Sequence, residues 1–218
     1  MSVQVVLFGA GSPVIVDVEE TCRRTAIEIV AIIRNLDVPT VALNQDKIID
    51  LARAAVELVQ LPIVLPLFTP AYRLHAREEA FSWGARHFLS LIDVTAILPG
   101  SIVIEPGVYV NCGAKIGGAS RLQEYSFINR GAVLGHHVDV GAFASVGPAA
   151  VIGAGAKIGR GTVVGAGAII LPGLTLGSNS VVGAGSVITR SVPSNTLVMG
   201  NPGRVKSRDI IGYNGKGV

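Results

Sequence analysis

Apolar residues recur with a strict period of six through the second half of the chain. Counting in sixes from Leu98 to Ile188 meets an aliphatic side chain at all sixteen positions. Since Ile, Leu and Val make up roughly a quarter of an average protein, chance does not explain this agreement. A small residue often stands two positions before the aliphatic one and a glycine directly after it, as in Ala132, Leu134 and Gly135. The period predicts a parallel β-helix built from six-residue units over residues 96–190.

The same period predicts how the units stack. Three units make one triangular coil of 18 residues, so the repeat winds about five coils with the aliphatic side chains inside. Neighbouring coils pair as parallel strands and stand about 4.8 Å apart. Residues 18 apart in the sequence are therefore expected to be neighbours in space.

The first half alternates apolar runs with helical patterns instead. This order predicts a small parallel sheet flanked by helices, a Rossmann-like α/β domain over residues 1–95. The expected strands are Val3–Phe8, Pro39–Leu43, Ile63–Phe68 and His87–Ile92, and the expected helices are Asp17–Asn35, Asp46–Leu58 and Ala71–Trp83.

A glycine-containing turn, Gly9-Ala10-Gly11, follows the first expected strand. In a nucleotide-binding fold this turn holds phosphate on backbone amides. A full dinucleotide fingerprint needs a third glycine, and Pro13 stands in that region instead. Both a phosphate-binding turn and a plain strand-to-helix turn remain open.

Composition supports the division into two architectures and a tail. Of the 27 glycines, 19 lie between Leu98 and Arg190, whereas residues 1–97 contain three. Residues 189–218 hold five basic residues and one acidic residue, within a chain whose formal net charge is +3. We expect residues 191–218 to form a tail that caps the open end of the β-helix.

Several classes of protein are disfavoured by composition. Two cysteines are too few for a disulfide framework, and the first residues lack the pattern of a signal peptide. The uncharged stretch 161–189 contains Pro172 and seven glycines, which disfavours a membrane span. The sequence shows no dense basic face with interleaved aromatic residues, which disfavours nucleic acid as a partner. These features predict a cytoplasmic protein.

Four segments carry a resemblance to a known family and are spread over nearly the whole chain: Gly9-Ala10-Gly11, residues 93–97, residues 127–136 with Asn129 followed by His136, and residues 200–204. The chain resembles the hexapeptide-repeat acyltransferases, and within them the sialic acid O-acetyltransferase and bacillosamine N-acetyltransferase family. This resemblance implies a left-handed β-helix, a homotrimer, and acetyl-CoA bound in a cleft between adjacent β-helices. It also implies acetyl transfer to a sugar, often a nucleotide-linked amino sugar held partly by the first domain.

His136 is the candidate general base. Acyl transfer from a thioester needs a base to take the acceptor's proton, and imidazole suits this near neutral pH. His136 stands at the third position of its unit, which faces outward or forms a corner. The alternative is that His136 and His137 are ordinary exposed turn residues. The resemblance favours catalysis by His136.

Other candidate catalytic groups follow from the spacing and from the resemblance. Ala154 stands 18 residues after His136, so its backbone amide is expected beside the imidazole, where it can stabilise an oxyanion. The family usually has glycine there. The family also commonly has an acidic residue directly after the base, where this chain has His137. Residues that could orient the base instead are Asn129, Asp139 and Glu124.

The resemblance implies the coenzyme and acceptor sites, through positions that match those of the family. Gly165-Ala166 and Gly183-Ala184 lie 18 apart, where small residues would let pantetheine lie against the backbone. The alternative is that the glycines only meet the needs of the turn. Arg204, with other basic residues of the tail, is placed to meet the coenzyme's phosphates or is simply solvated. The candidate contacts for the acceptor are Gly9, Ala10, Gly11, Asn44 and His137.

These observations predict an acetyl-CoA-dependent acetyltransferase that acts on an amine, or alternatively a hydroxyl, of a sugar, with no metal. Coenzyme A leaves directly, without an acyl-enzyme. One alternative is a zinc hydratase resembling γ-carbonic anhydrase, which needs three histidines from neighbouring coils and subunits. A second alternative is a non-catalytic scaffold or binding protein, which the departures at Ala154 and His137 keep open.

Overall fold

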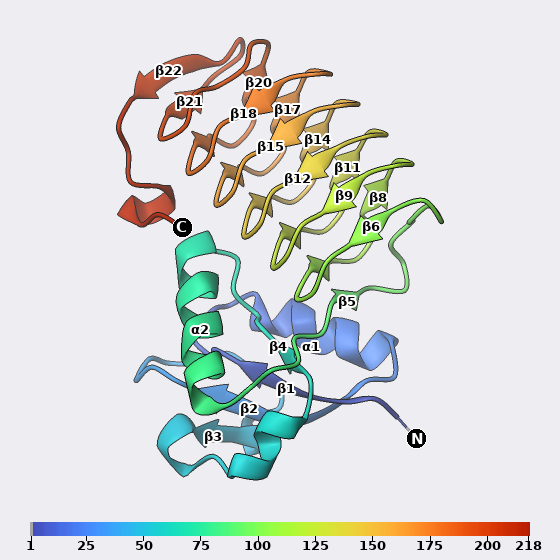
Figure 1. Cartoon of the computed structure of the whole chain (residues 1–218), viewed down its shortest axis with the longest axis vertical. Coiled ribbons are helices and arrows are strands. Elements are labelled where there is room, and N and C mark those ends of the chain that lie inside the picture. Colours follow the sequence, from blue (N-terminus) through green and yellow to red (C-terminus); the bar gives the residue numbers. More distant parts are fainter. Residues whose placement is uncertain (1) are drawn as a thin grey trace.

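The computed structural model describes residues 2–218, and its first part is a four-stranded parallel sheet with helices (Figure 1). The sheet has the order β3-β2-β1-β4. Its strands are β1 (Gln4–Phe8), β2 (Glu28–Arg34), β3 (Ile48–Asp50) and β4 (Ile63–Val64). The helices are α1 (Ile15–Arg24) and α2 (Pro70–Trp83), with short 3-10 helices η1 (Gln45–Lys47), η2 (Leu51–Arg53) and η3 (Val56–Gln60). The predicted Rossmann-like fold class is confirmed.

The positions of several predicted elements in this domain are wrong. The expected helix Asp17–Asn35 is a short helix, α1, followed by the strand β2. The break falls at Ala26, whose φ is +53°, and the next residues form a β-branched run that is buried along most of its length rather than on one helical face.

Further along the chain, Pro39–Leu43 forms no strand, because β3 takes the place beside β2. The expected helix Asp46–Leu58 is replaced by β3 and short 3-10 helices. The expected strand His87–Ile92 is reduced to β5 (Leu91–Ile92), which pairs with β7 of the β-helix. These strand positions are determined by pairing between segments that are distant in sequence. Local periodicity gives no information about such pairing.

The second part of the chain is the predicted left-handed parallel β-helix, in which three sheets run along a stack of coils (Figure 1). We call them the first, second and third sheets in the order in which each coil passes through them. The first sheet contains β5 (Leu91–Ile92), β7 (Tyr109–Val110), β10 (Phe127–Ile128), β13 (Ser145–Val146), β16 (Val163–Val164), β19 (Val181–Val182), β21 (Leu197–Met199) and β22 (Arg204–Ser207). The second contains β8 (Lys115–Ile116), β11 (Val133–Leu134), β14 (Val151–Ile152), β17 (Ile169–Ile170) and β20 (Val187–Ile188). The third contains β6 (Val103–Ile104), β9 (Arg121–Leu122), β12 (Asp139–Val140), β15 (Lys157–Ile158) and β18 (Thr175–Leu176).

The register between coils is the predicted 18 residues, as in the pairing of Leu134 with Ile152. Fourteen of the sixteen periodic aliphatic side chains are buried in one continuous core, and Leu98 and Ile104 pack against it at the first coil. The last coil is two residues shorter, since Val181 pairs with Leu197. Burial of one aliphatic side chain per unit therefore holds the stack together.

Two different backbone demands shape the corners of each coil. From Ile104 to Val182, the residue three positions after each inward aliphatic residue has a positive φ, as at His137 and Gly155. The glycine directly after the aliphatic residue has another role. A Cβ on Gly135 would lie 2.6 Å from the N atom of Ala154 in the next coil. Glycine at that position thus permits close stacking of coils.

Arg73 on α2 joins the two parts of the molecule. Its buried guanidinium donates hydrogen bonds to the Phe143 carbonyl oxygen at 2.7 Å and to the Tyr125 carbonyl oxygen at 2.7 Å, both in the β-helix. It also donates to the Phe68 carbonyl oxygen at 2.9 Å. Burial lowers the pKa of Arg73 to about 9, and the oxygen acceptors around it compensate for the lost hydration.

Candidate active site

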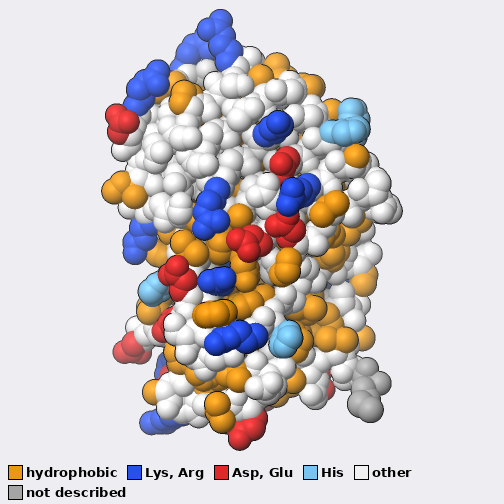
Figure 2. Space-filling view, viewed as in Figure 1, with side chains coloured by type: hydrophobic (Ala, Val, Ile, Leu, Met, Phe, Trp, Pro, Cys, Tyr) orange, Lys and Arg blue, Asp and Glu red, His pale blue; other side chains and the backbone are white. Residues whose placement is uncertain are grey.

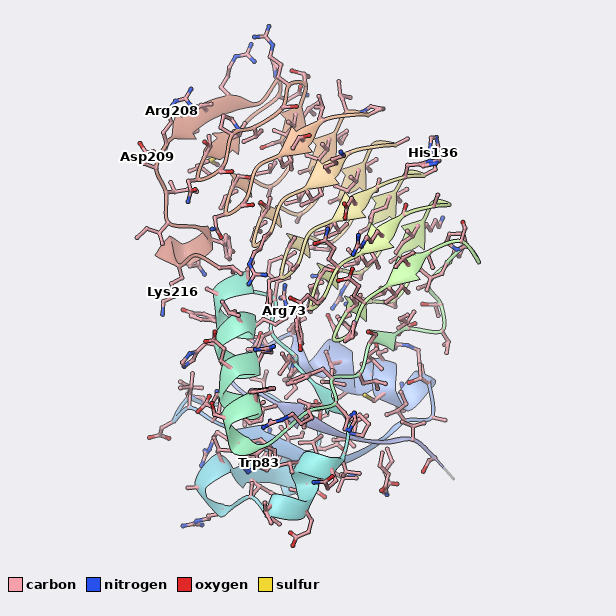
Figure 3. All side chains as sticks on the ribbon, viewed as in Figure 1. Arg73, Trp83, His136, Arg208, Asp209 and Lys216 are labelled. Atoms are coloured by element: carbon pink, nitrogen blue, oxygen red, sulfur yellow. The ribbon has the colours of Figure 1, made fainter. Side chains whose placement is uncertain are left out.

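His136 lies on the corner between the second and third sheets. Its side chain is exposed and points away from the β-helix at the outer end of the coil (Figure 3). The His136 carbonyl oxygen accepts a hydrogen bond of 2.9 Å from the N–H of Gly155, so the next coil lies directly against it. The imidazole is thus presented to solvent by a backbone that the stacked coils hold rigidly.

The side chain that His136 contacts is His137. Their Nδ1 atoms are 2.9 Å apart, and the rings meet edge to face with an interplanar angle of 88°. His137 has a φ of +57°, which turns the chain so that two successive side chains meet on one side. His137, at the position where the resemblance implies an acidic residue, is therefore in contact with the candidate base.

Asn129 and Asp139 bond to other groups. Asn129 lies on the corner between the first and second sheets, where its Oδ1 accepts 3.0 Å and 2.8 Å hydrogen bonds from Asn111 Nδ2 and the Arg130 N–H. Asp139 lies on the third sheet and accepts a 2.8 Å hydrogen bond from Gln123 Nε2. No hydrogen bond joins either side chain to His136 within the described residues of one chain.

Ala154 occupies the corner position one coil beyond His136. Its N–H donates to no protein group in the part of the chain that the structure describes. The same corner position in the following coil is Pro172, which has no N–H. The Ala154 amide is therefore a free donor on the coil next to the imidazole.

Small residues form a shelf on the corner between the first and second sheets. Ala166 and Ala184 are exposed there, and the N–H of Gly185 donates a 2.8 Å hydrogen bond to the Ala166 carbonyl oxygen. Gly165 is glycine because a Cβ would lie 2.5 Å from the N atom of Ala184. A Cβ on Gly183 would lie 2.7 Å from Cγ of Met199. Packing thus explains both glycines.

Basic residues gather at the end of the β-helix. A cavity of about 450 Å³ lies between the last coil and β22, and its lining includes Arg190, Arg204 and Arg208. All three arginines are exposed. Guanidinium groups in this arrangement suit phosphate groups.

A second cavity, of about 430 Å³, lies at the carboxyl ends of β1, β2 and β4, and Gly9 and Gly11 line it. Ala10 is buried, and Asn44 donates from its N–H to Glu19 Oε1 at 2.9 Å and does not line the cavity. Asn44 was expected to follow the second strand. The residues that do so are Asn35 and Leu36, which line the cavity.

Among the lining residues that the sequence analysis missed, three have titratable side chains: Tyr72, His75 and Lys216. Tyr72 and His75 lie one turn apart on α2, directly after β4. The signal was available, since the carboxyl end of a parallel strand is the binding edge of such sheets. Lys216 carried no signal, because the fold alone brings the tail to this cavity.

Lys216, which lines this cavity, and His136 lie on opposite sides of the molecule (Figure 3). Between the His136 corner and the shelf corner runs the second sheet, whose outer face carries Val133, Val151 and Ile169 in register, each 39% exposed. An apolar surface of the second sheet thus lies between the corner that carries His136 and the corner that carries Ala166 and Ala184.

Neither a cluster of metal ligands nor a membrane-spanning helix is found among residues 2–218. Among residues 2–218, no group of three or more His, Cys, Asp and Glu side chains is placed to hold a metal ion, so one protomer offers no donor set for the zinc-hydratase alternative. No helix of the described chain is long and apolar enough to cross a membrane. Figure 2 shows basic and acidic side chains interspersed over one face, without a continuous basic area.

Comparison with known proteins agrees with this architecture. Residues 155–190 match the bacterial transferase hexapeptide family (six repeats). No curated protein matches the sequence significantly. PerB from Caulobacter crescentus, solved with CoA and GDP-perosamine, is 26% identical, with 95% of this chain and 98% of that chain covered and a TM-score of 0.78.

Two further structures share the fold. The acetyltransferase domain of PglB from Neisseria gonorrhoeae, solved with acetyl coenzyme A, is 24% identical, with 94% of this chain and 100% of that domain covered and a TM-score of 0.80. WeeI from Acinetobacter baumannii is 18% identical, with coverages of 94% and 100% and a TM-score of 0.71. The predicted resemblance to hexapeptide-repeat acyltransferases is confirmed.

Proposed function

We propose that the protein is an acetyl-CoA-dependent acetyltransferase whose acceptor is the amine of a nucleotide-linked amino sugar. The observation that carries this proposal is the likeness over 95% of the chain to a protein solved with both CoA and GDP-perosamine. The exposed His136 on a stacked corner, beside a free backbone amide, supplies the groups that acyl transfer needs.

In the proposed reaction, the acceptor's amine attacks the thioester carbonyl of acetyl-CoA. A C–N bond forms and the C–S bond breaks, so coenzyme A leaves as the thiolate. His136 takes the proton from the attacking nitrogen and passes it to that thiolate. The N–H of Ala154 donates to the carbonyl oxygen while it carries negative charge. No acyl-enzyme is needed, because both substrates meet at one site.

The coenzyme and the acceptor bind to different surfaces of the protein. The shelf at Ala166 and Ala184 takes the pantetheine arm, and Arg204 with its neighbours takes the coenzyme's phosphates. The cavity at Gly9 and Gly11 takes the nucleotide of the acceptor.

A homotrimer completes the site. Within one chain the acceptor cavity lies on the opposite side from His136, so an acceptor bound in the cavity needs His136 of another copy (Figure 3). The apolar face of the second sheet is the contact surface we propose for that assembly. Because acetyl-CoA and nucleotide sugars are made in the cytoplasm, we propose that the enzyme acts there.

The test is release of coenzyme A thiol from acetyl-CoA across a panel of acceptors. The panel contains UDP-, dTDP- and GDP-linked amino sugars and sialic acid. Release with a nucleotide-linked amino sugar supports the proposal, whereas release with sialic acid alone indicates transfer to a hydroxyl. A protein that releases no thiol and does not bind acetyl-CoA is a scaffold, and the proposal fails.

A further inference from the structure

The last residues of the chain return to the first domain along the outside of the β-helix (Figure 1). Two stacked corner asparagines hold this segment. Asn195 Nδ2 donates a 2.8 Å hydrogen bond to the Ile210 carbonyl oxygen. Asn179 Nδ2 donates to the Val218 oxygen at 3.2 Å, and Asn179 Oδ1 accepts from the Val218 N–H at 2.9 Å. Hydrogen bonds therefore hold the segment to the β-helix at Ile210 and at Val218.

Between Ile210 and Val218 the segment packs on the first domain. The ring of Tyr213, in η4 (Tyr213–Gly215), meets the ring of Phe68 edge to face, with centroids 6.4 Å apart. Lys216 Nζ lies 4.9 Å from the centroid of the Tyr72 ring. The ring attracts the exposed ammonium group and favours this position beside α2.

Lys216 is also part of the wall of the cavity that holds Gly9 and Gly11. The lining of this cavity contains no Asp or Glu side chain, and its titratable members besides Tyr72 are Lys216 and His75. A lysine directed to a cavity without a carboxylate partner is suited to a ligand that brings its own negative charge. Ser12 and Thr69 add hydroxyl donors to the same wall.

We propose that Lys216 is a contact for the diphosphate of the nucleotide-linked acceptor, so that the returning tail is part of the acceptor site. This proposal rests on the proposed function and adds to it a residue of the tail. A nucleoside diphosphate combines an apolar base with two charged phosphates, and the cavity combines apolar walls of Leu36, Val38 and Leu67 with this lysine.

Binding of nucleosides and nucleotides measured by calorimetry tests the contact, using GDP, UDP and dTDP with the matching nucleosides. For the diphosphate that the wild type binds best, Lys216→Met weakens binding about tenfold, and Lys216→Arg retains most of it. Binding of the matching nucleoside does not change. The matched control is Lys157→Met, an exposed lysine on the third sheet.

A second variant tests the tail without touching the charge. Asn179 has a φ of +55°, so Asn179→Gly keeps the corner conformation and removes both hydrogen bonds to Val218. We expect weaker diphosphate binding and unchanged nucleoside binding, as in Lys216→Met. Ala149→Gly, at another exposed corner with φ +54°, is the control.

The outcomes separate this inference from the proposed function. If the wild type binds a diphosphate and Lys216→Met binds it equally well, the role of Lys216 is wrong while the acceptor class stands. Equal weakening for nucleoside and diphosphate also contradicts it, since Lys216 then acts by packing. If the wild type binds none of the three diphosphates, both the acceptor class and the inference fail.

Discussion

His136 and His137 face each other through their Nδ1 atoms, 2.9 Å apart. A hydrogen bond between two imidazoles needs one ring to donate and the other to accept. When His136 donates from Nδ1, its Nε2 carries the lone pair and is free to accept a proton from the acceptor. In the proposed mechanism, His137 then fixes the tautomer and the ring of the base, which is the role that the family resemblance gives to a carboxylate.

This pairing predicts the behaviour of substitutions at His137. His137→Ala lowers kcat about tenfold and leaves the KM for acetyl-CoA unchanged, because the base loses its orientation but not its contact with substrate. His137→Asp recovers activity relative to His137→Ala. Its acidic limb in the pH–rate profile moves to higher pH, because a carboxylate favours the protonated imidazole. Steady-state kinetics across pH measure both effects. An unchanged kcat in His137→Ala contradicts the orienting role.

The free amide of Ala154 allows a direct test of oxyanion stabilisation. Ala154→Pro removes the N–H, and Pro172 at the matching position of the next coil indicates that this corner accepts proline. We expect kcat to fall about 10²-fold with the fold retained. Pro172→Ala is the control. Circular dichroism and kcat are measured together, and a folded Ala154→Pro with full activity excludes this amide from catalysis.

Assembly should depend on the apolar face of the second sheet. Val151→Asp places a charge between Val133 and Ile169, so we expect the trimer to dissociate and activity to be lost with it. Val103→Asp makes the same change at an exposed valine of the third sheet and should leave both unchanged. Light scattering after gel filtration gives the mass. If Val151→Asp remains a trimer, the interface does not lie on this face of the second sheet.

Acid should weaken the junction between the two domains at Asp93. Burial alone raises the pKa of this carboxyl, but hydrogen bonds from Arg24, Thr95 and Thr21 lower it to about 2. A carboxyl whose pKa falls on folding adds stability above its unfolded pKa, near 4, and loses it as pH falls toward 2. The contribution is about 2 kcal/mol.

Urea unfolding between pH 5 and pH 2 measures this loss. Asp93→Asn should be less stable at pH 5 and show a flatter dependence on pH. Asp50→Asn, which affects a surface pair with Arg34, is the control and should have a smaller effect. Identical pH dependence in Asp93→Asn and the wild type would show that Asp93 does not carry the effect.

The β-helix could be predicted closely because its determinants are local. Every unit must place one aliphatic side chain inside, so the period that includes Leu134 and Ile152 contains the register itself. In the first domain the strand Glu28–Arg34 was assigned to a helix, because an apolar β-branched run is ambiguous without its partner strands. The domain limits at residues 95 and 190 stay predictions.

Only the part of the candidate site that the local period determines could be predicted. The 18-residue period placed Ala154 beside His136, since both lie on one stack of corners. Asn129 and Asp139 were candidates for orienting His136, but the coil carries them to another corner and to a sheet face, where they bond to other groups. The contribution of Lys216 to a distant cavity depends on the path of the tail, which no sequence pattern describes.

The most direct test of the account compares His136→Ala with the wild type in thiol release from acetyl-CoA, using the acceptor that the panel identifies. We expect the rate to fall about 10²- to 10⁴-fold with acetyl-CoA binding retained, and His87→Ala, an exposed histidine of the first domain, to match the wild type. Undiminished release by folded His136→Ala would contradict the assignment of this residue as the base.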